Sequence, residues 1–276
     1  MTTSEPLALQ DFGPDLHVDV TDAVPPPSVD VLGIPLAITD YARTMDWMDA
    51  TIVDGGTGYV CVAATHTVMA CQEDPELRAA VVESDLTVPD GQPLVWAMNA
   101  LGQNLPSRVY GPELMARYCE RSVGTGTKMY LYGGRNQGAL VQLALNLRRR
   151  YPGVQIVGGY SPPFRELSDE EQDAIVEGIN RSEADVVWVG IGVPKQEKWM
   201  AQMRPRLRTP VLIGVGAAFD FHAGLIPQAP SVVQSAGMEW AFRLSREPRR
   251  LWKRYLRYNP RFVTGFARQW ATQRPR

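Results

Sequence analysis

Residues 85–91, DLTVPDG, combine a short apolar run with a carboxylate on a tight turn, and a helical pattern over residues 92–101 follows at once. A strand that leads directly into a helix is the repeating unit of open α/β sheets, and ligands bind at the carboxyl ends of their strands. Asp90, between Pro89 and Gly91, is therefore a candidate reactive group held toward a pocket. The alternative is that Asp90 only caps the following helix, because Asp is a preferred N-cap residue.

Strand-like and helical patterns alternate along the middle of the chain. Runs rich in Val, Ile and Tyr predict strands, and amphipathic patterns predict helices between them. The predicted strands are residues 29–37, 58–64, 85–91, 128–132, 154–158, 185–191 and 210–215. The predicted helices are residues 42–52, 66–83, 92–101, 111–122, 168–182 and 195–207, and a further helix is predicted around Leu140, Leu143 and Leu147. This alternation predicts an α/β fold: a Rossmann-like, mostly parallel sheet with helices on both faces, plus a basic helical C-terminal appendage.

Composition divides the chain into three parts. Residues 1–28 are polar and acidic, lack the pattern of a signal peptide, and are predicted to form a flexible leader. Residues 29–236 are the predicted α/β core, and residues 237–276 the helical appendage, with breaks at Pro248 and Pro260. No apolar run approaches the roughly 20 residues that span a bilayer.

The charge of the chain is distributed unevenly. The formal net charge is −2, but residues 237–276 carry 11 Lys/Arg and 2 Asp/Glu, whereas the remainder carries 17 and 28. Such a basic segment attracts either nucleic acid or an anionic membrane surface. Aromatic and leucine residues interleaved with the basic ones favour the membrane surface. The three isolated cysteines predict reduced core residues of a cytoplasmic protein.

Glycine-rich turns follow three further predicted strands. Free N–H groups at the start of a helix favour an anionic group such as phosphate, and arginine or glutamine side chains suit phosphate or sugar. One such turn also has a purely steric explanation, since βα turns often need glycine. Several at one edge of a sheet favour a nucleotide crevice. The candidate substrate-binding residues in these turns are Gly133, Gly134, Arg135, Gly192, Pro194, Lys195, Gln196, Gly216, Phe219 and Asp220.

Thr65, His66 and Arg108 complete the set of substrate-binding candidates. Thr65 and His66 follow a buried strand at its carboxyl end, although a lone histidine is more often structural. Arg108 stands on a proline-containing loop between two predicted helices. Its guanidinium suits a diphosphate, whereas its ordinary role would be a surface ion pair.

Metal and dinucleotide sites are disfavoured. The sequence has no carboxylate pair at DxD spacing near a strand end, no HExxH and no Cys/His cluster. The GxGxxG fingerprint with its downstream acidic residue is also missing. We therefore expect neither a metal nor a cofactor.

Several motifs in fixed order make the chain resemble the WecG/TagA/CpsF glycosyltransferases, glycosyltransferase family 26, over about residues 31–265. The motifs are PDG at 89–91, LVWA at 94–97, RVYG at 108–111, LYGG at 131–134, GVPKQE at 192–197, GVGAAFD at 214–220, and the basic C-terminal series that starts with GMEW at 237–240. The resemblance implies inverting, metal-independent transfer of an N-acetylmannosamine-type sugar, glucuronic acid or a related hexose. It implies a UDP-sugar donor and a polyprenyl-diphosphate-linked saccharide as acceptor, in cell-surface or exopolysaccharide synthesis.

The resemblance also implies residue roles. The general base falls on Asp90, a substrate-contacting arginine on Arg108 and a sugar-contacting glutamine on Gln196. The appendage is implied to close the active site and to engage the inner face of the cell membrane, and its candidate residues are Arg243, Arg250 and Arg254. The chain departs from the family pattern at Ala64, where Asn is common, and at Gln228, where many members have Arg.

Two other functions remain open at this point. One is a nicotinamide- or flavin-dependent enzyme on the same kind of sheet. The other is a nucleotide-binding, membrane-associated scaffold or sensor without catalysis, which would keep the glycine turns and the basic appendage but would not need Asp90. A homo-oligomer is compatible with every one of these functions.

Overall fold

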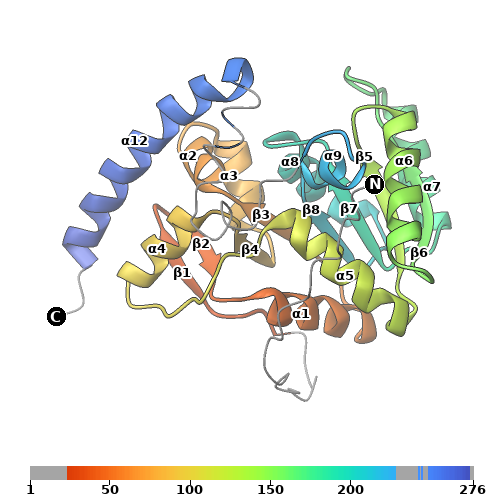
Figure 1. The fold of residues 1–276 in the computed structure, drawn as a ribbon, viewed down its shortest axis with the longest axis horizontal. Helices are drawn as coiled ribbons and strands as arrows, with labels where there is room; N and C mark the ends of the chain where they lie inside the picture. Colours follow the sequence, from red (N-terminus) through yellow and green to blue (C-terminus); the bar gives the residue numbers. More distant parts are fainter. Residues whose placement is uncertain (1–23, 228–241, 243, 245–247, 274–276) are drawn as a thin grey trace, which may run out of the picture.

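A six-stranded parallel sheet forms the centre of the molecule (Figure 1). The computed structural model describes residues 24–227, 242, 244 and 248–273. The strand order is β4-β3-β8-β7-β5-β6, and all five neighbouring pairs are parallel. The strands are β3 (Gly58–Ala63), β4 (Leu86–Pro89), β5 (Lys128–Gly133), β6 (Gln155–Tyr160), β7 (Val186–Gly190) and β8 (Val211–Gly214). The predicted Rossmann-like α/β class is confirmed.

Alternate strand residues feed two separate cores, one on each face of the sheet. On β3, Tyr59 and Cys61 pack into the core built with α2, α3, α4, α7 and α8. Val60 and Val62 point the other way, into the core built with α1, α5, α6 and α9. This period of two places helices on both faces of the sheet.

The helices of the core mostly lie where their patterns predict. Their bounds are α1 (Tyr41–Val53), α2 (Thr65–Ala70), α3 (Pro75–Val82), α4 (Gln92–Ala100), α5 (Gly111–Thr125), α6 (Gln137–Arg150), α7 (Asp169–Arg181), α8 (Lys195–Met203) and α9 (Ala218–His222). The predicted helix over residues 66–83 is wrong in one respect, because it is divided into α2 and α3. Asp74 ends the turn between them by accepting a hydrogen bond from the Leu77 amide (3.0 Å), and Pro75 opens α3. The predicted helix over residues 195–207 also ends early, at Met203, where a 3₁₀ turn containing Pro205 takes over.

The predicted strand over residues 29–37 is a separate antiparallel hairpin, β1 (Ser28–Val31) and β2 (Ile34–Ala37). Leu32 and Gly33 form its two-residue turn and have φ angles of 56° and 77°. Positive φ at both central positions matches the right-handed twist of a hairpin. β1 starts at Ser28, the last residue of the predicted leader.

The helix α12 (Pro248–Gln273) leaves the core and runs along the side of α2 and α4 (Figure 1). The predicted break at Pro260 is wrong, because the helix continues through it. Contacts on both sides of Pro260 hold the helix to the core. Glu73 accepts hydrogen bonds from Arg257 and Arg261, and Gln269 Nε2 donates to the Asp30 carbonyl (2.8 Å). None of the described helices is long and apolar enough to cross a membrane.

Candidate active site

The carboxyl ends of the parallel strands bring the predicted site residues to one edge of the sheet. The strand order changes direction in the middle of the sheet. From β3 the chain continues outward to β4 at one side of the sheet, and from β5 it continues outward to β6 at the other side. Such a change of direction marks where open α/β sheets bind ligands. The turns after β3, β4, β5, β7 and β8, together with the first residues of the helices that follow them, carry all the candidates that precede the appendage except Arg108.

Asp90 follows β4, and its backbone is fixed to the neighbouring strand. Its amide donates a 2.8 Å hydrogen bond to the carbonyl of Ala63, the last residue of β3. The N-cap of α4 is Gly91, which has no side chain that could cap the helix, and Asp90 lies one residue before it. The interpretation of Asp90 as the helix cap is therefore wrong. One carboxylate oxygen of Asp90, Oδ1, is buried.

The structure brings Arg108 to Asp90. The Val109 amide donates to the Pro89 carbonyl (2.8 Å), which ties the Arg108 loop to the end of β4. Arg108 Nη1 donates to the Asp90 carbonyl (3.4 Å), and the guanidinium carbon lies 4.4 Å from the centre of the Tyr110 ring. Arg108 thus places a positive charge beside the candidate base.

Tyr41 belongs to the same cluster and was not predicted. Its hydroxyl accepts a hydrogen bond from the Tyr110 amide (3.0 Å). Burial raises the pKa of Tyr41 to about 12, and the negative charges of Glu113 and Asp90 add to the increase. The phenol therefore keeps its proton at neutral pH. Nothing in the local pattern of α1 signals this contact, because it depends on how α1 and the Arg108 loop pack.

Thr65 and His66 open α2 directly after β3. A Cβ atom built on Gly91 would lie 3.7 Å from Thr65 Oγ1, so Thr65 lies next to the Asp90 turn. His66 is half-buried at the same edge of the sheet. The N-cap of α2 is Ala64, which makes no side-chain capping hydrogen bond.

Gln196 joins the turns after β7 and β8. It is 2% exposed, and its Oε1 accepts a hydrogen bond from the Gly192 amide (3.2 Å). A Cβ on Gly216 would lie 3.3 Å from the same oxygen. The structure therefore brings Gln196, Gly192 and Gly216 together, with the glutamine amide bracing the two turns.

The N–H groups of these turns are largely used within the protein. Gly192 donates to Gln196, Gly216 to the Val189 carbonyl (3.3 Å) and Gly134 to the Gly190 carbonyl (3.0 Å). The expectation of free N–H groups, made for the turn over residues 190–197, is wrong for Gly192. Gly192 nevertheless borders open space, since a Cβ there would meet nothing within 4 Å. Pro194 and Lys195 beside it are exposed.

Glu197 is a second residue that the sequence did not single out. It has no exposed surface, and its Oε1 accepts a 2.9 Å hydrogen bond from Gln196 Nε2. Its Oε2 has no hydrogen-bond partner among the described residues. Burial raises the pKa of Glu197 to about 7. The signal for it was its place in GVPKQE, directly after Gln196.

The turn after β5 is shaped by close packing. Gly133 has a φ of 131°, and a Cβ there would lie 2.5 Å from the carbonyl of Gly190. Phe219 is 3% exposed and packs its ring on Gly190, which explains its burial without a ligand.

Arg135 and Asp220 form a two-point ion pair, with distances of 2.9 and 3.1 Å. These two predicted substrate contacts therefore touch each other. Among the described residues, no group of three or more His, Cys, Asp or Glu side chains could hold a metal ion.

The side chains of the appendage candidates lie outside the part of the chain that the structure describes. Arg243 and Gln228 are not among the described residues, and neither are the side chains of Arg250 and Arg254.

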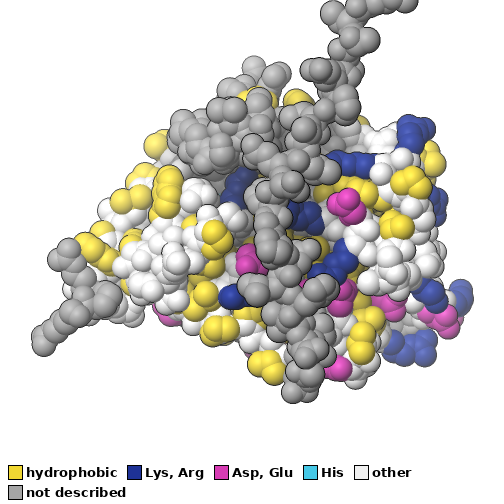
Figure 2. Space-filling view, turned by 60° about the horizontal axis from the view of Figure 1, so that its bottom comes forward, with side chains coloured by type: hydrophobic (Ala, Val, Ile, Leu, Met, Phe, Trp, Pro, Cys, Tyr) yellow, Lys and Arg dark blue, Asp and Glu magenta, His cyan; other side chains and the backbone are white. Residues whose placement is uncertain are grey.

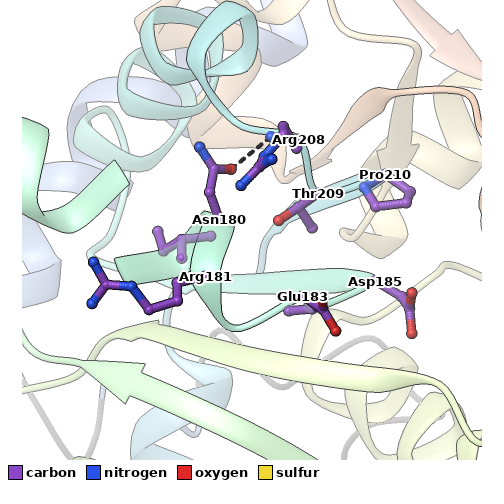
Figure 3. A pocket seen from close by; sticks show the side chains of 9 residues that line it. Asn180, Arg181, Glu183, Asp185, Arg208, Thr209 and Pro210 are labelled. Carbon is purple, nitrogen blue, oxygen red and sulfur yellow. Dashed lines mark hydrogen bonds between the residues drawn. The ribbon is translucent and has the colours of Figure 1, made fainter. Parts of the chain in front are cut away.

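A cavity of about 500 Å³ lies at the opposite edge of the sheet, where β7 and β8 begin (Figure 3). Polar side chains that line this cavity make hydrogen bonds to backbone amides of the protein. Asn180 accepts a hydrogen bond from the Arg208 amide (2.8 Å), and Asp185 accepts one from the Lys128 amide (2.7 Å). This cavity is at the amino ends of the strands, far from the predicted site residues.

The sequence model of the WecG/TagA/CpsF glycosyl transferase family matches residues 29–276. The chain therefore belongs to this family of glycosyltransferases. A relative from Bacillus spizizenii, N-acetylglucosaminyldiphosphoundecaprenol N-acetyl-beta-D-mannosaminyltransferase, is 28% identical over 221 residues, which cover 79% of this chain and 82% of the relative.

Proposed function

We propose that this glycosyltransferase moves a hexose, of the N-acetylmannosamine or glucuronic acid type, from a UDP-sugar to a polyprenyl-diphosphate-linked saccharide. The name of the Bacillus relative supports the acceptor class and the N-acetylmannosamine-type sugar. The observation that carries the proposal is the position of Asp90, a carboxylate that directly follows β4 at the carboxyl edge of the sheet and has Arg108 beside it.

Asp90 acts as the general base in a single inverting displacement. Its carboxylate takes the proton of the acceptor hydroxyl as that oxygen attacks the anomeric carbon, and the bond from this carbon to UDP breaks on the opposite face. The proton ends on Asp90 and the electron pair of the broken bond on the UDP diphosphate. Thr65, beside Gly91, is positioned to orient a sugar hydroxyl at this point.

Side chains, without a metal ion, stabilise the charge of the departing diphosphate. Arg108, next to Asp90, and Lys195, exposed beside the Gly192 turn, supply positive charge from the core. Arg243, Arg250 or Arg254 of the appendage adds a further guanidinium. Fixed positive groups aimed at a developing anion contribute strongly because they need no reorganisation during the reaction.

The enzyme works at the cytoplasmic, inner face of the cell membrane, where α12 binds the surface. Trp252, Leu256 and Val263 are 48%, 68% and 64% exposed on this helix. They recur at helical spacing and alternate with exposed basic residues such as Lys253 and Arg268. An amphipathic helix of this composition suits an anionic lipid surface.

The test compares Asp90→Asn with wild type in release of UDP from UDP-N-acetylmannosamine, using a short-chain lipid-diphosphate N-acetylglucosamine acceptor. We expect an unchanged circular dichroism spectrum and a kcat lower by about 10²–10⁴. Near wild-type turnover would remove Asp90 as the base. Absence of UDP release by the wild type with any UDP-sugar and lipid acceptor would instead favour a non-catalytic scaffold.

A further inference from the structure

An apolar groove of about 540 Å³ lies between α4 and α12. It is lined by Thr65, Pro93 and Trp96 on one side and by Val263, Phe266 and Trp270 on the other, with further carbon-rich side chains between them. Its volume is within the range of about 300–1,000 Å³ that is typical of small-molecule sites. Hydrophobic side chains also show on the left part of Figure 2, the side of the molecule on which α4 and α12 lie.

The inner end of the groove is the candidate active site. Thr65 lines the groove, and its Oγ1 is also the neighbour of Gly91 in the Asp90 turn. Pro93 lies in the first turn of α4, three residues after Asp90. A molecule lying in the groove therefore has one end at the place where the acceptor hydroxyl must be deprotonated.

The outer part of the groove is fixed in shape but open to its surroundings. Trp270 Nε1 donates a 3.1 Å hydrogen bond to the Ala100 carbonyl, which links the far ends of the two helices. Trp96 is 59% exposed and Val263 is 64% exposed. Exposed apolar surface of this kind marks an interaction site when it is contiguous.

We propose that this groove holds the first isoprene units of the lipid acceptor. The inference rests on the proposed function, because it takes the acceptor to be a prenyl diphosphate. In such a molecule the hydrocarbon chain is bonded directly to the diphosphate, so a saccharide at Asp90 leaves the chain close to the catalytic edge. The groove supplies a continuous apolar path away from that edge, along the same helix whose exposed Trp252 and Leu256 face a membrane.

A chain fits this groove better than a second copy of the protein does. The groove reaches the catalytic edge at Thr65, which lies next to Gly91, and a ligand that takes part in the reaction has to extend to that edge whereas a second copy does not. The basic character of the α12 segment, 11 Lys/Arg against 2 Asp/Glu in residues 237–276, complements the diphosphate and opposes pairing with an identical segment.

The experiment measures binding to the full chain by calorimetry, with inorganic diphosphate, geranyl diphosphate and farnesyl diphosphate below their micelle concentrations. We expect affinity to rise at least tenfold with each added isoprene unit, because burial of only about two of its CH₂ groups supplies a factor of about ten. Val263→Asp and Ala100→Trp should remove this dependence on chain length and leave the affinity for inorganic diphosphate unchanged. Val141→Asp, a matched change at a 50% exposed valine on α6, should behave as wild type.

Equal affinities for the three ligands, or an unchanged chain-length dependence in both groove variants, would overturn the proposal. So would a wild-type dimer in sedimentation that Val263→Asp converts to monomer, since that assigns the groove to a second copy. The two proposals fail separately. Prenyl binding in the groove without sugar transfer would contradict the proposed function but not the role of the groove. Sugar transfer with a KM that is independent of prenyl length would contradict the role of the groove but not the proposed function.

Discussion

The side-chain amide of Gln196 donates a 2.9 Å hydrogen bond to Oε1 of Glu197, a carboxyl group with no exposed surface. Gln196 in turn accepts from the Gly192 amide, so the buried acid supports the residue that joins the turns after β7 and β8. A carboxylate at this position lacks the solvent that would stabilise its charge. The protonated acid is therefore favoured, and the pKa of Glu197 rises to about 7.

Glu197→Gln should make the protein more stable at pH 8 than wild type. The folded pKa of about 7 lies above the ordinary value of 4.5, so the folded state binds more protons between these values. The stability of the wild type therefore falls as pH rises from 4.5 to 7, and then levels off. The shift corresponds to roughly 3 kcal/mol at most. The variant keeps an oxygen for Gln196 but carries no charge, so this loss should be absent.

Urea unfolding at pH 5 and pH 8 measures this difference. The free energies of unfolding of the two proteins should be close at pH 5 and should separate at pH 8. Glu177→Gln is the control, because the Glu177 side chain on α7 is 69% exposed. Parallel pH dependences for wild type and Glu197→Gln would show that Glu197 is ionised in the folded protein at little cost.

Local sequence patterns predicted the sheet well, and they predicted that the candidate residues lie at its carboxyl edge. Period-two burial marks β3, and the run that ends at Asp90 marks β4, because strand and turn chemistry acts over a few residues. The hairpin turn at Leu32 and Gly33 had a local signal too, a glycine between two apolar runs. The sequence nevertheless predicts one continuous strand over residues 29–37, because both halves of the run have the same strand-like composition.

The contacts that complete the site depend on tertiary packing, and sequence reasoning missed them for that reason. Tyr41 reaches the Arg108 loop through the packing of α1, and Trp270 reaches Ala100 through the placement of α12. In the sequence, Glu197 has the pattern of an ordinary polar residue in the first turn of a helix. Only its position beneath the β7 and β8 turns makes it a buried acid. The pairing of Arg135 with Asp220 likewise joins residues from two separate glycine turns.

Gly133→Ala should destabilise the protein severely. The φ of 131° disfavours any side chain, and the added methyl would lie 2.5 Å from the carbonyl of Gly190 on β7. Backbone atoms of a central strand cannot move aside cheaply, so the expected loss is roughly 3 kcal/mol or more. Gly178→Ala on α7 is the control. Its added methyl meets nothing within 4 Å, and alanine is favoured in a helix by about 0.5–1 kcal/mol.

Chemical unfolding of both alanine variants tests this contrast. We expect opposite signs, with Gly178→Ala slightly more stable than wild type and Gly133→Ala much less stable or unable to fold. A Gly133→Ala protein of wild-type stability would mean that β5 and β7 separate easily at their carboxyl ends. The close packing described for this edge would then not be a constraint.

Arg108→Lys should recover only part of the activity that Arg108→Ala loses. Arg108 donates to the Asp90 carbonyl (3.4 Å), and its guanidinium carbon lies over the Tyr110 ring, 4.4 Å from the ring centre. Lysine keeps the positive charge but has neither the planar group that stacks nor the fork that contacts a diphosphate at two points. We expect Arg108→Ala to lower kcat by about 10²–10³, as for loss of one group that stabilises a developing anion. Steady-state transfer and calorimetric binding of UDP separate a loss of catalysis from a loss of donor affinity.

Arg150→Lys is the control for stacking alone, because the guanidinium carbon of Arg150, the last residue of α6, lies 5.3 Å from the centre of the Tyr151 ring. Wild-type kcat in Arg108→Lys would mean that charge suffices at this position, and wild-type kcat in Arg108→Ala would exclude the residue from the reaction.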